Sequence, residues 1–280
     1  MSEAEGFKLP RNEDTTTEEL LLSLARKHKG RGLDIKAYTK KEESGNGADW
    51  AFWFTDSTWK GIGARIQAKR LFADEGRYKS LFHQSGKQKK VSEATGQLTP
   101  NQCETLLSYG DPSDPLNNLI PVYVFYNSDE LKQNTAFSAH TQIAWWSLCG
   151  HPFTSPDWGI STASALAIKN ANWGKNDRPG DFPMIPWHCL VCACCWDDRP
   201  ADPSLPSLVG HGLRQLYGDS EDDVPAIADL GFSFEPTDNA PKWVGLLREG
   251  RESEESLDEE MDRLNLKGVA IIEETEARDG

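Results

Sequence analysis

The sequence predicts an α/β fold, and three observations carry that prediction. Signals for helices and strands alternate over residues 15–127 in the order helix, strand, strand, strand, helix, strand. The chain has 280 residues, enough to bury a sizeable core in one large domain or two small ones. Hydrophobic residues make up 38% of it, with 10 Trp, which suits a packed interior and excludes collagen, coiled coil and wholesale disorder.

The first part of the chain supplies a helix and three strands. Residues 15–29 are expected to form the helix, because a Thr can cap it, acids follow in its first turn and basic residues end its last turn. Residues 32–38, 49–54 and 62–71 have the alternating or apolar character of strands. The last two are separated by turn residues, so we expect them to pair.

Further elements are expected along the middle of the chain. Residues 121–126 form a continuous apolar run too short for a helix, which predicts a buried strand. Residues 100–109, 139–148 and 161–170 are expected to be helices. Residues 185–196 are apolar throughout and fit either a buried strand or a buried helix.

Composition divides the chain into four segments. Residues 1–14 are expected to be a disordered leader and residues 15–196 an α/β domain. A Pro-rich stretch then begins an extension over residues 197–248, packed on the core. Residues 249–280 are expected to be an acidic tail, in which residues 268–272 could form a last short strand.

Charge is unevenly distributed between the two ends of the chain. The net charge is −14, yet residues 26–110 carry 16 basic and 9 acidic side chains, whereas residues 201–280 carry 20 acidic and 7 basic ones. A basic region on an acidic protein is typical of a phosphate-binding surface, although a solvated Lys-rich face has the same composition.

The chain is expected to be an intracellular protein with no membrane-spanning helix. Its longest uncharged apolar run is far shorter than the roughly 20 residues of a membrane helix, and its acidic first residues are not those of a targeting peptide. The 6 Cys are too unevenly spaced for a disulfide framework. We therefore expect a cytoplasmic protein, or a nuclear one in a eukaryote, with reduced cysteines.

One group of residues has the composition of a catalytic site. Asp49 begins one strand, and Gln67 and Lys69 lie two apart on the next, so they project from the same face. A hairpin brings Asp49 beside them. A carboxylate, an amide oxygen and the backbone carbonyl of Ala68 are hard ligands suited to Mg²⁺, and a neighbouring ammonium can hold water and stabilise negative charge. Phosphodiester hydrolysis needs these groups.

The motifs around these residues resemble the PD-(D/E)xK, or restriction-endonuclease-like, superfamily. The matching stretches are GADW at residues 47–50 and IQAKRL at residues 66–71, and Gln in place of the second acid is similar to the Mrr-like branch. The longer set GADWAFWF, IQAKRL, QCETLL, PVYVFYN and IPWHCLVC also resembles an uncharacterised family assigned to that fold. The resemblance implies a central mixed sheet flanked by helices, with an α/β extension.

The same resemblance assigns roles to single residues. It implies that Asp49 and Gln67 hold Mg²⁺ (or Mn²⁺) and that Lys69 is the catalytic lysine. A Glu from the first helix often completes the site in the superfamily; Glu19 is the best-placed match and Glu43 is a rival. With Gln in place of an acid, the site should bind its metal more weakly.

Other residues would serve the substrate. Gln102 lies where some superfamily members carry a helix Gln near the site. Basic side chains expected to contact nucleic acid, double-stranded DNA rather than RNA, are Arg65, Arg70, Lys87, Lys89 and Lys90. The implied function is metal-dependent cleavage, in restriction or defence, and many nucleases of this fold act as homodimers.

Two alternatives remain open at this point. The fold could be that of an inactive relative that binds nucleic acid or a protein partner. The cysteine-rich run from Cys189 to Cys195 could bind zinc or do redox chemistry, but it lacks a second Cys-x-x-Cys pair and its apolar neighbours favour a buried strand.

Overall fold

The computed structural model describes somewhat more than half of the chain. The described residues are 13–28, 32–39, 48–72, 76–78, 81, 102–108, 119–127, 159–171, 182–191, 200–218, 232–250 and 254–275. The expected leader, residues 40–47, most of residues 79–97 and the helix expected at 139–148 lie outside these residues.

The described elements are eight strands and seven helices. The strands are β1 (Leu33–Thr39), β2 (Ala48–Thr55), β3 (Gly61–Phe72), β4 (Arg77–Tyr78), β5 (Leu119–Tyr126), β6 (Ile160–Ser164), β7 (Ile185–Pro186) and β8 (Leu266–Glu274). The helices are α2 (Glu13–His28), α3 (Gln102–Ser108), α5 (Ala165–Asn170), the 3₁₀ helix η4 (Trp187–Leu190), α6 (Leu205–Tyr217), α8 (Lys242–Glu249) and α9 (Glu254–Leu264).

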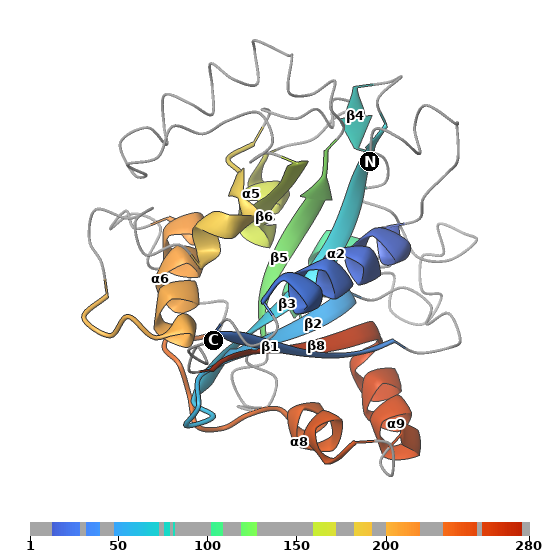
Figure 1. The fold of residues 1–280 in the computed structure, drawn as a ribbon. Helices are drawn as coiled ribbons and strands as arrows, with labels where there is room; N and C mark the ends of the chain where they lie inside the picture. Colours follow the sequence, from blue (N-terminus) through green and yellow to red (C-terminus); the bar gives the residue numbers. More distant parts are fainter. Residues whose placement is uncertain are drawn as a thin grey trace.

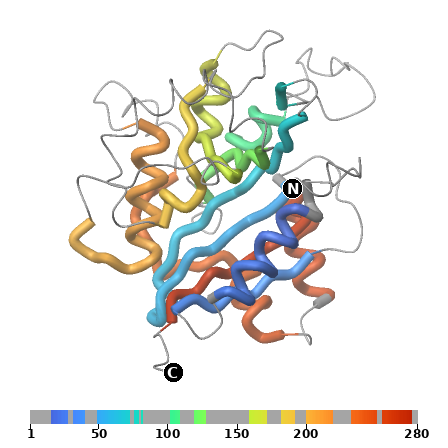
Figure 2. The backbone as a smooth tube through the Cα atoms, turned by 45° about the horizontal axis from the view of Figure 1, so that its top comes forward, coloured from blue at the N-terminus to red at the C-terminus, as the bar shows by residue number. Residues whose placement is uncertain are grey.

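A mixed sheet forms the centre of the fold (Figure 1). Its strand order is β1-β8-β2-β3-β5-β6-β7, and β4 pairs with β3. Strands β2 and β3 form the expected antiparallel hairpin, whereas β3 and β5 run parallel. The last strand of the chain, β8, lies between β1 and β2, antiparallel to the first and parallel to the second. Figure 2 shows this insertion, with the red strand beside the blue ones.

Helices cover both faces of the sheet, so its central strands are apolar on both sides. One face, which carries Trp50, Ile66 and Ala68, packs against α2 and α6. The other face, which carries Trp53 and Tyr123, packs against α3, α5, α8 and α9. Every residue of β5 is buried, which explains the uninterrupted apolar run in its sequence.

The order of elements expected over residues 15–127 is confirmed, apart from the short additional strand β4. Helix α2 begins two residues before the expected Thr cap, and β1, β2, β3, α3 and β5 lie within two residues of the expected bounds at each end. The coarse fold class, α/β with a mixed sheet flanked by helices, therefore stands.

The helix expected over residues 161–170 is only half right. Its first residues form β6, and α5 begins at Ala165. Thr162 donates its hydroxyl to the Tyr123 carbonyl at 2.9 Å, and Ser161 accepts from the Asn127 side chain at 2.9 Å, so the polar side chains are satisfied within the sheet. Ser164 then caps α5 through its side-chain oxygen.

The prediction of an acidic tail over residues 249–280 is wrong for those of its residues that the structure describes. Helix α9 packs Leu257, Met261 and Leu264 into the core, and β8 is an internal strand of the sheet. The short strand expected at 268–272 is therefore present and longer. The expected extension at 197–248 also supplies core, since α6 packs on the same sheet as β2 and β3.

Buried tyrosines make stability sensitive to alkaline pH. Burial raises the pKa values of Tyr78, Tyr123 and Tyr217 well above their usual range near 10. Above about pH 10 the unfolded chain releases phenolic protons that the folded chain retains, so stability must fall as pH rises. We expect the midpoint of thermal unfolding to decline between pH 10 and 11, with the tyrosinate absorbance of these three residues appearing only on unfolding.

The variant Tyr78→Phe checks this cause, because it removes one of these protons. Its thermal midpoint should decline less steeply with pH than that of the wild type. A wild-type midpoint that stays constant to pH 11 would contradict the argument.

Candidate active site

Asp49 and Gln67 lie together at the end of the β2–β3 hairpin. The last hairpin pair is Trp50 with Ile66, so Asp49 faces Gln67 one step further. The side-chain nitrogen Nε2 of Gln67 donates to Oδ2 of Asp49, and the backbone N–H of Ala68 donates to the same oxygen at 2.8 Å. Both side chains are almost fully buried, at 2% and 1% exposed. The sequence-based pairing of these residues is therefore present in the structure.

Two oxygen atoms converge on the Gln67 amide nitrogen. Besides Oδ2 of Asp49, the carbonyl oxygen of Ala68 lies 3.5 Å from Nε2. Within the described residues, the other amide atom, Oε1 of Gln67, is buried without a hydrogen-bond partner. A buried acceptor without a hydrogen-bond partner lowers the free energy of unfolding, by about 1–3 kcal/mol in typical cases.

Lys69 lies on the same face of β3 and is held by α3. Its ammonium nitrogen Nζ donates to the side-chain oxygen Oε1 of Gln102 at 3.0 Å. Gln102 is the first residue of α3, and the helix is anchored by buried Cys103, Leu106 and Leu107. Lys69 is 5% exposed, so the contact with Gln102, rather than solvent, fixes the position of its ammonium group. The helix Gln therefore contacts the lysine, as its position in the sequence suggested.

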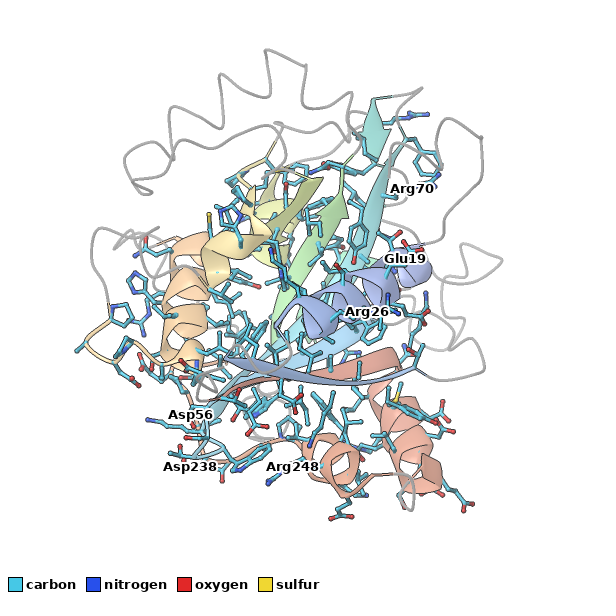
Figure 3. All side chains as sticks on the ribbon, in the orientation of Figure 1. Glu19, Arg26, Asp56, Arg70, Asp238 and Arg248 are labelled. Atoms are coloured by element: carbon cyan, nitrogen blue, oxygen red, sulfur yellow. The ribbon has the colours of Figure 1, made fainter. Side chains whose placement is uncertain are left out.

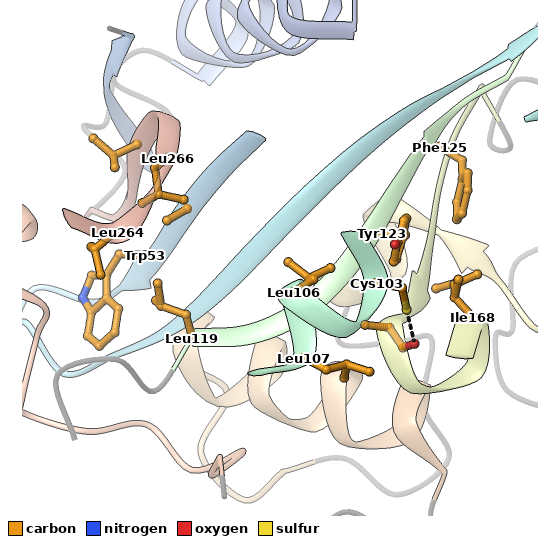
Figure 4. Packing of buried hydrophobic residues seen from close by; sticks show 14 of the residues in the cluster. Trp53, Cys103, Leu106, Leu107, Leu119, Tyr123, Phe125, Ile168, Leu264 and Leu266 are labelled. Atoms are coloured by element: carbon orange, nitrogen blue, oxygen red, sulfur yellow. Dashed lines mark hydrogen bonds between the residues drawn. The ribbon is translucent and has the colours of Figure 1, made fainter. Parts of the chain in front are cut away.

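Buried side chains of β5 and α3 form the floor beside these residues. Tyr123 is the partner of Gln67 in the parallel pairing of β3 with β5. Burial, then the neighbouring Cys103 and Asp49, raise the pKa of its phenol, which donates to the Leu81 carbonyl at 3.2 Å. Burial also raises the pKa of the Cys103 thiol to about 11. Both groups therefore remain protonated near neutral pH. Figure 4 shows Cys103 and Tyr123 packed together.

Sequence reasoning missed Lys267, which lies next to Asp49. Its Nζ is 2.9 Å from Oδ1 of Asp49, and its side chain is 30% exposed. The pairs Ala48 with Leu266 and Trp50 with Gly268 make the two residues cross-strand neighbours. The signal available in the sequence was a single Lys before the apolar run of β8, but nothing local indicates which strand β8 joins.

Glu19 does not join this group. Glu19 is exposed on α2 (Figure 3), the helix whose Leu21 packs on the Ala68 side of the sheet. Asp49 and Lys69 lie on the other side, with Tyr123 and α3. Glu19 instead borders a shallow depression with Ser23 and Arg26. Its rival Glu43 lies outside the described residues.

Arg65, expected to bind substrate, is a structural residue. It is 1% exposed, and its guanidinium Nη2 donates to the carbonyl of Leu264 at 2.5 Å. A cation is favourable at that point because Leu264 ends α9, where helix carbonyls carry partial negative charge. Arg65 thus fixes the end of α9 immediately before β8, and this burial rules it out as a direct contact to nucleic acid.

The remaining expected substrate contacts are only partly described. Arg70 is half-buried on β3, with its guanidinium over the ring of Phe72 at 4.9 Å from the ring centre. Lys87, Lys89 and Lys90 lie outside the described residues.

The oxygen atoms around Gln67 fit a hard divalent cation. Turning the Gln67 amide by half a turn exchanges its nitrogen and oxygen, which brings Oε1 toward Asp49 Oδ2 and the Ala68 carbonyl. Three oxygens that converge in this way repel one another unless a donor or a cation lies among them, and they are the ligand type that Mg²⁺ prefers. No cluster of three or more His, Cys, Asp or Glu side chains placed for a metal occurs in the described part of the chain. The fit therefore depends on one carboxylate and neutral oxygens.

The cysteine run is described only at its beginning. Cys189 is buried in η4, and Cys103 is a second buried cysteine. Cys192, Cys194 and Cys195 lie outside the described residues, so the zinc and redox hypothesis stays a hypothesis.

The fold and the site together define a class: an α/β protein with a mixed sheet between helices and a buried Asp–Gln–Lys group on one face. A family model described as "Family of unknown function (DUF6615)" matches residues 1–278, and the chain belongs to that family. No curated protein and no solved structure matches the chain. None of the helices within the described ranges is long and apolar enough to cross a membrane.

Proposed function

We propose that this protein is a metal-dependent nuclease with a restriction-endonuclease-like core. The observation that carries the proposal is the convergence of the Asp49 carboxylate and the Ala68 carbonyl on the Gln67 amide, with Lys69 on the same face. These groups match the ligands and the lysine that the sequence motifs imply.

In this proposal Asp49, the side-chain oxygen of Gln67 and the Ala68 carbonyl hold Mg²⁺ or Mn²⁺. The bound ion would polarise the scissile phosphate and lower the pKa of its water. Lys69 holds the attacking water and stabilises charge that develops on phosphate oxygens. Gln102 fixes the direction of the Lys69 ammonium, so the charge is in place before substrate arrives. The proposed substrate is double-stranded DNA.

One observation favours a second candidate, a nucleic-acid-binding protein that does not cut. The Asp49 carboxylate already has a cation partner in Lys267. If that pair is permanent, the site binds no metal, and the fold offers only positive charge to phosphate.

The test is incubation of the purified full chain with supercoiled plasmid, linear duplex, single-stranded DNA and RNA, each with Mg²⁺, Mn²⁺ or EDTA. We expect metal-dependent cutting of duplex DNA by the wild type, absent in Asp49→Asn. The matched control is Asp34→Asn, which removes a carboxylate from the exposed side of β1.

The outcomes separate the two candidates. Retention of duplex without cutting, with an affinity that falls steeply as salt rises, would favour the binding protein. Cutting that survives in Asp49→Asn would show that the activity belongs to another site or to a contaminant.

A further inference from the structure

The ion pair between Lys267 and Asp49 places a cation directly on the one carboxylate of the proposed site. Lys267 binds Oδ1 of Asp49 from β8, while Oδ2 accepts from Gln67 and Ala68 on β3. With Lys69 on the same face, the described part of the site has two ammonium groups and one carboxylate. This inference rests on the proposed function, because it concerns the metal that the site would hold.

We infer that Lys267 is an internal competitor of the divalent cation. Its ammonium neutralises Asp49 in the metal-free protein, and a metal ion must share that carboxylate with it or displace it. Like charges on one carboxylate repel, so the presence of Lys267 weakens metal binding. The site is therefore held in a low-affinity form until a phosphate group contributes negative charge.

The two lysines differ in their exposure to solvent. Lys69 is 5% exposed and held by Gln102, whereas the side chain of Lys267 is 30% exposed. A part-exposed ammonium on a long side chain can exchange Asp49 for a phosphate oxygen of the bound nucleic acid. Binding of metal and binding of substrate are thereby coupled through Lys267.

The Lys267–Asp49 ion pair is not needed to hold β8 in the sheet. The strand pairs along its length with both β1 and β2. Gly268 allows close approach to β2, since a Cβ there would lie 2.7 Å from the Trp50 ring. Arg65 fixes the chain just before the strand through Leu264. Lys267 can therefore be changed without losing the determinants of strand docking.

The experiment measures the dissociation constant of Mn²⁺ for the full chain, without nucleic acid, by titration calorimetry. The central variant is Lys267→Gln, which keeps a hydrogen-bond donor for the buried Asp49 but removes the charge. Lys267→Arg keeps the charge. Lys242→Gln is the matched control, because Lys242 lies on α8 and pairs with Glu260, 3.9 Å away. Asp49→Asn reports whether the metal binds at this site.

We expect Lys267→Gln to bind Mn²⁺ about tenfold more tightly than the wild type, at the lower end of the effect of residues that contact metal ligands. Lys267→Arg and Lys242→Gln should match the wild type, and Asp49→Asn should lose binding. Circular dichroism and thermal unfolding confirm that each variant is folded.

Other results overturn the inference in distinguishable ways. If Lys267→Gln binds Mn²⁺ no more tightly than the wild type while Asp49→Asn loses binding, the metal site stands and the competition is refuted. If Asp49→Asn binds as the wild type does, or no variant binds Mn²⁺, the proposed metal site fails and the competition fails with it.

Discussion

Lys69→Met is expected to reduce the rate of DNA cleavage by about 10²–10⁴-fold, the range typical of a positioned catalytic group. The substitution keeps the length of the side chain and removes the ammonium that Gln102 directs at 3.0 Å. The proposed metal ligands are untouched, so Mn²⁺ should still bind with at least wild-type affinity. The measurement is single-turnover cleavage at saturating Mn²⁺, which separates the chemical step from metal and substrate binding.

Two controls make this result specific. Lys36→Met removes an exposed lysine from β1 and should leave the cleavage rate unchanged. Thermal unfolding of Lys69→Met should show only a small loss of stability, about 1 kcal/mol, from the unpaired Gln102 oxygen. Cleavage by Lys69→Met at the wild-type rate would mean that Lys69 serves only to anchor α3.

The strands that carry the site could be predicted because their signals are local. The hairpin of β2 and β3 follows from two apolar runs joined by turn residues, and a period of two places Gln67 and Lys69 on one face. Asp49 then follows from antiparallel pairing. These inferences need only neighbours within about 20 residues of each other, and they agree with the structure.

The sequence-based predictions that failed concern elements whose structure is fixed by contacts between distant segments. The small Ser and Ala residues of β6 weaken its strand signal, and the place of Ser161 and Thr162 in the sheet is fixed by Asn127 and the Tyr123 carbonyl. The acidic residues of 249–264 suggested a tail, although α9 buries one apolar side and places its acids mainly outward. Local propensity cannot reveal such tertiary pairing.

The sequence-based prediction of the site was incomplete for the same reason. Arg65 and Lys267 look alike in sequence, as single basic residues in or beside an apolar run. The structure gives them different roles, because one is buried against the end of α9 and the other reaches Asp49 from an inserted strand. Only the position of β8 between β1 and β2 distinguishes a structural cation from one in the site.

Gln67→Glu is expected to have the second large effect. It should lower the thermal stability of the metal-free protein and raise the stability gained on binding metal. The new carboxyl group would face Asp49 in a place where the wild-type amide donates to Oδ2, and both side chains are buried. Two buried carboxylates this close repel each other, and Lys267 already pairs with the other oxygen of Asp49, so the introduced group keeps a proton to higher pH than an exposed glutamate. The folded variant then binds more protons than its unfolded chain, and its stability falls as pH rises above about 4.3.

In EDTA at neutral pH we therefore expect a lower thermal midpoint than that of the wild type, with a deficit that grows as the pH rises. Mn²⁺ should reverse it, because a second carboxylate ligand raises metal affinity, by roughly 10–100-fold on the scale of changes around metal ligands, and bound metal stabilises the folded state. Gln215→Glu makes the same charge change on α6, which packs on the other face of the sheet, and should show no Mn²⁺ effect. Equal midpoints of Gln67→Glu with Mn²⁺ and with EDTA would refute the role of Gln67 as a metal ligand, since two facing carboxylates that attract no cation do not form a metal site.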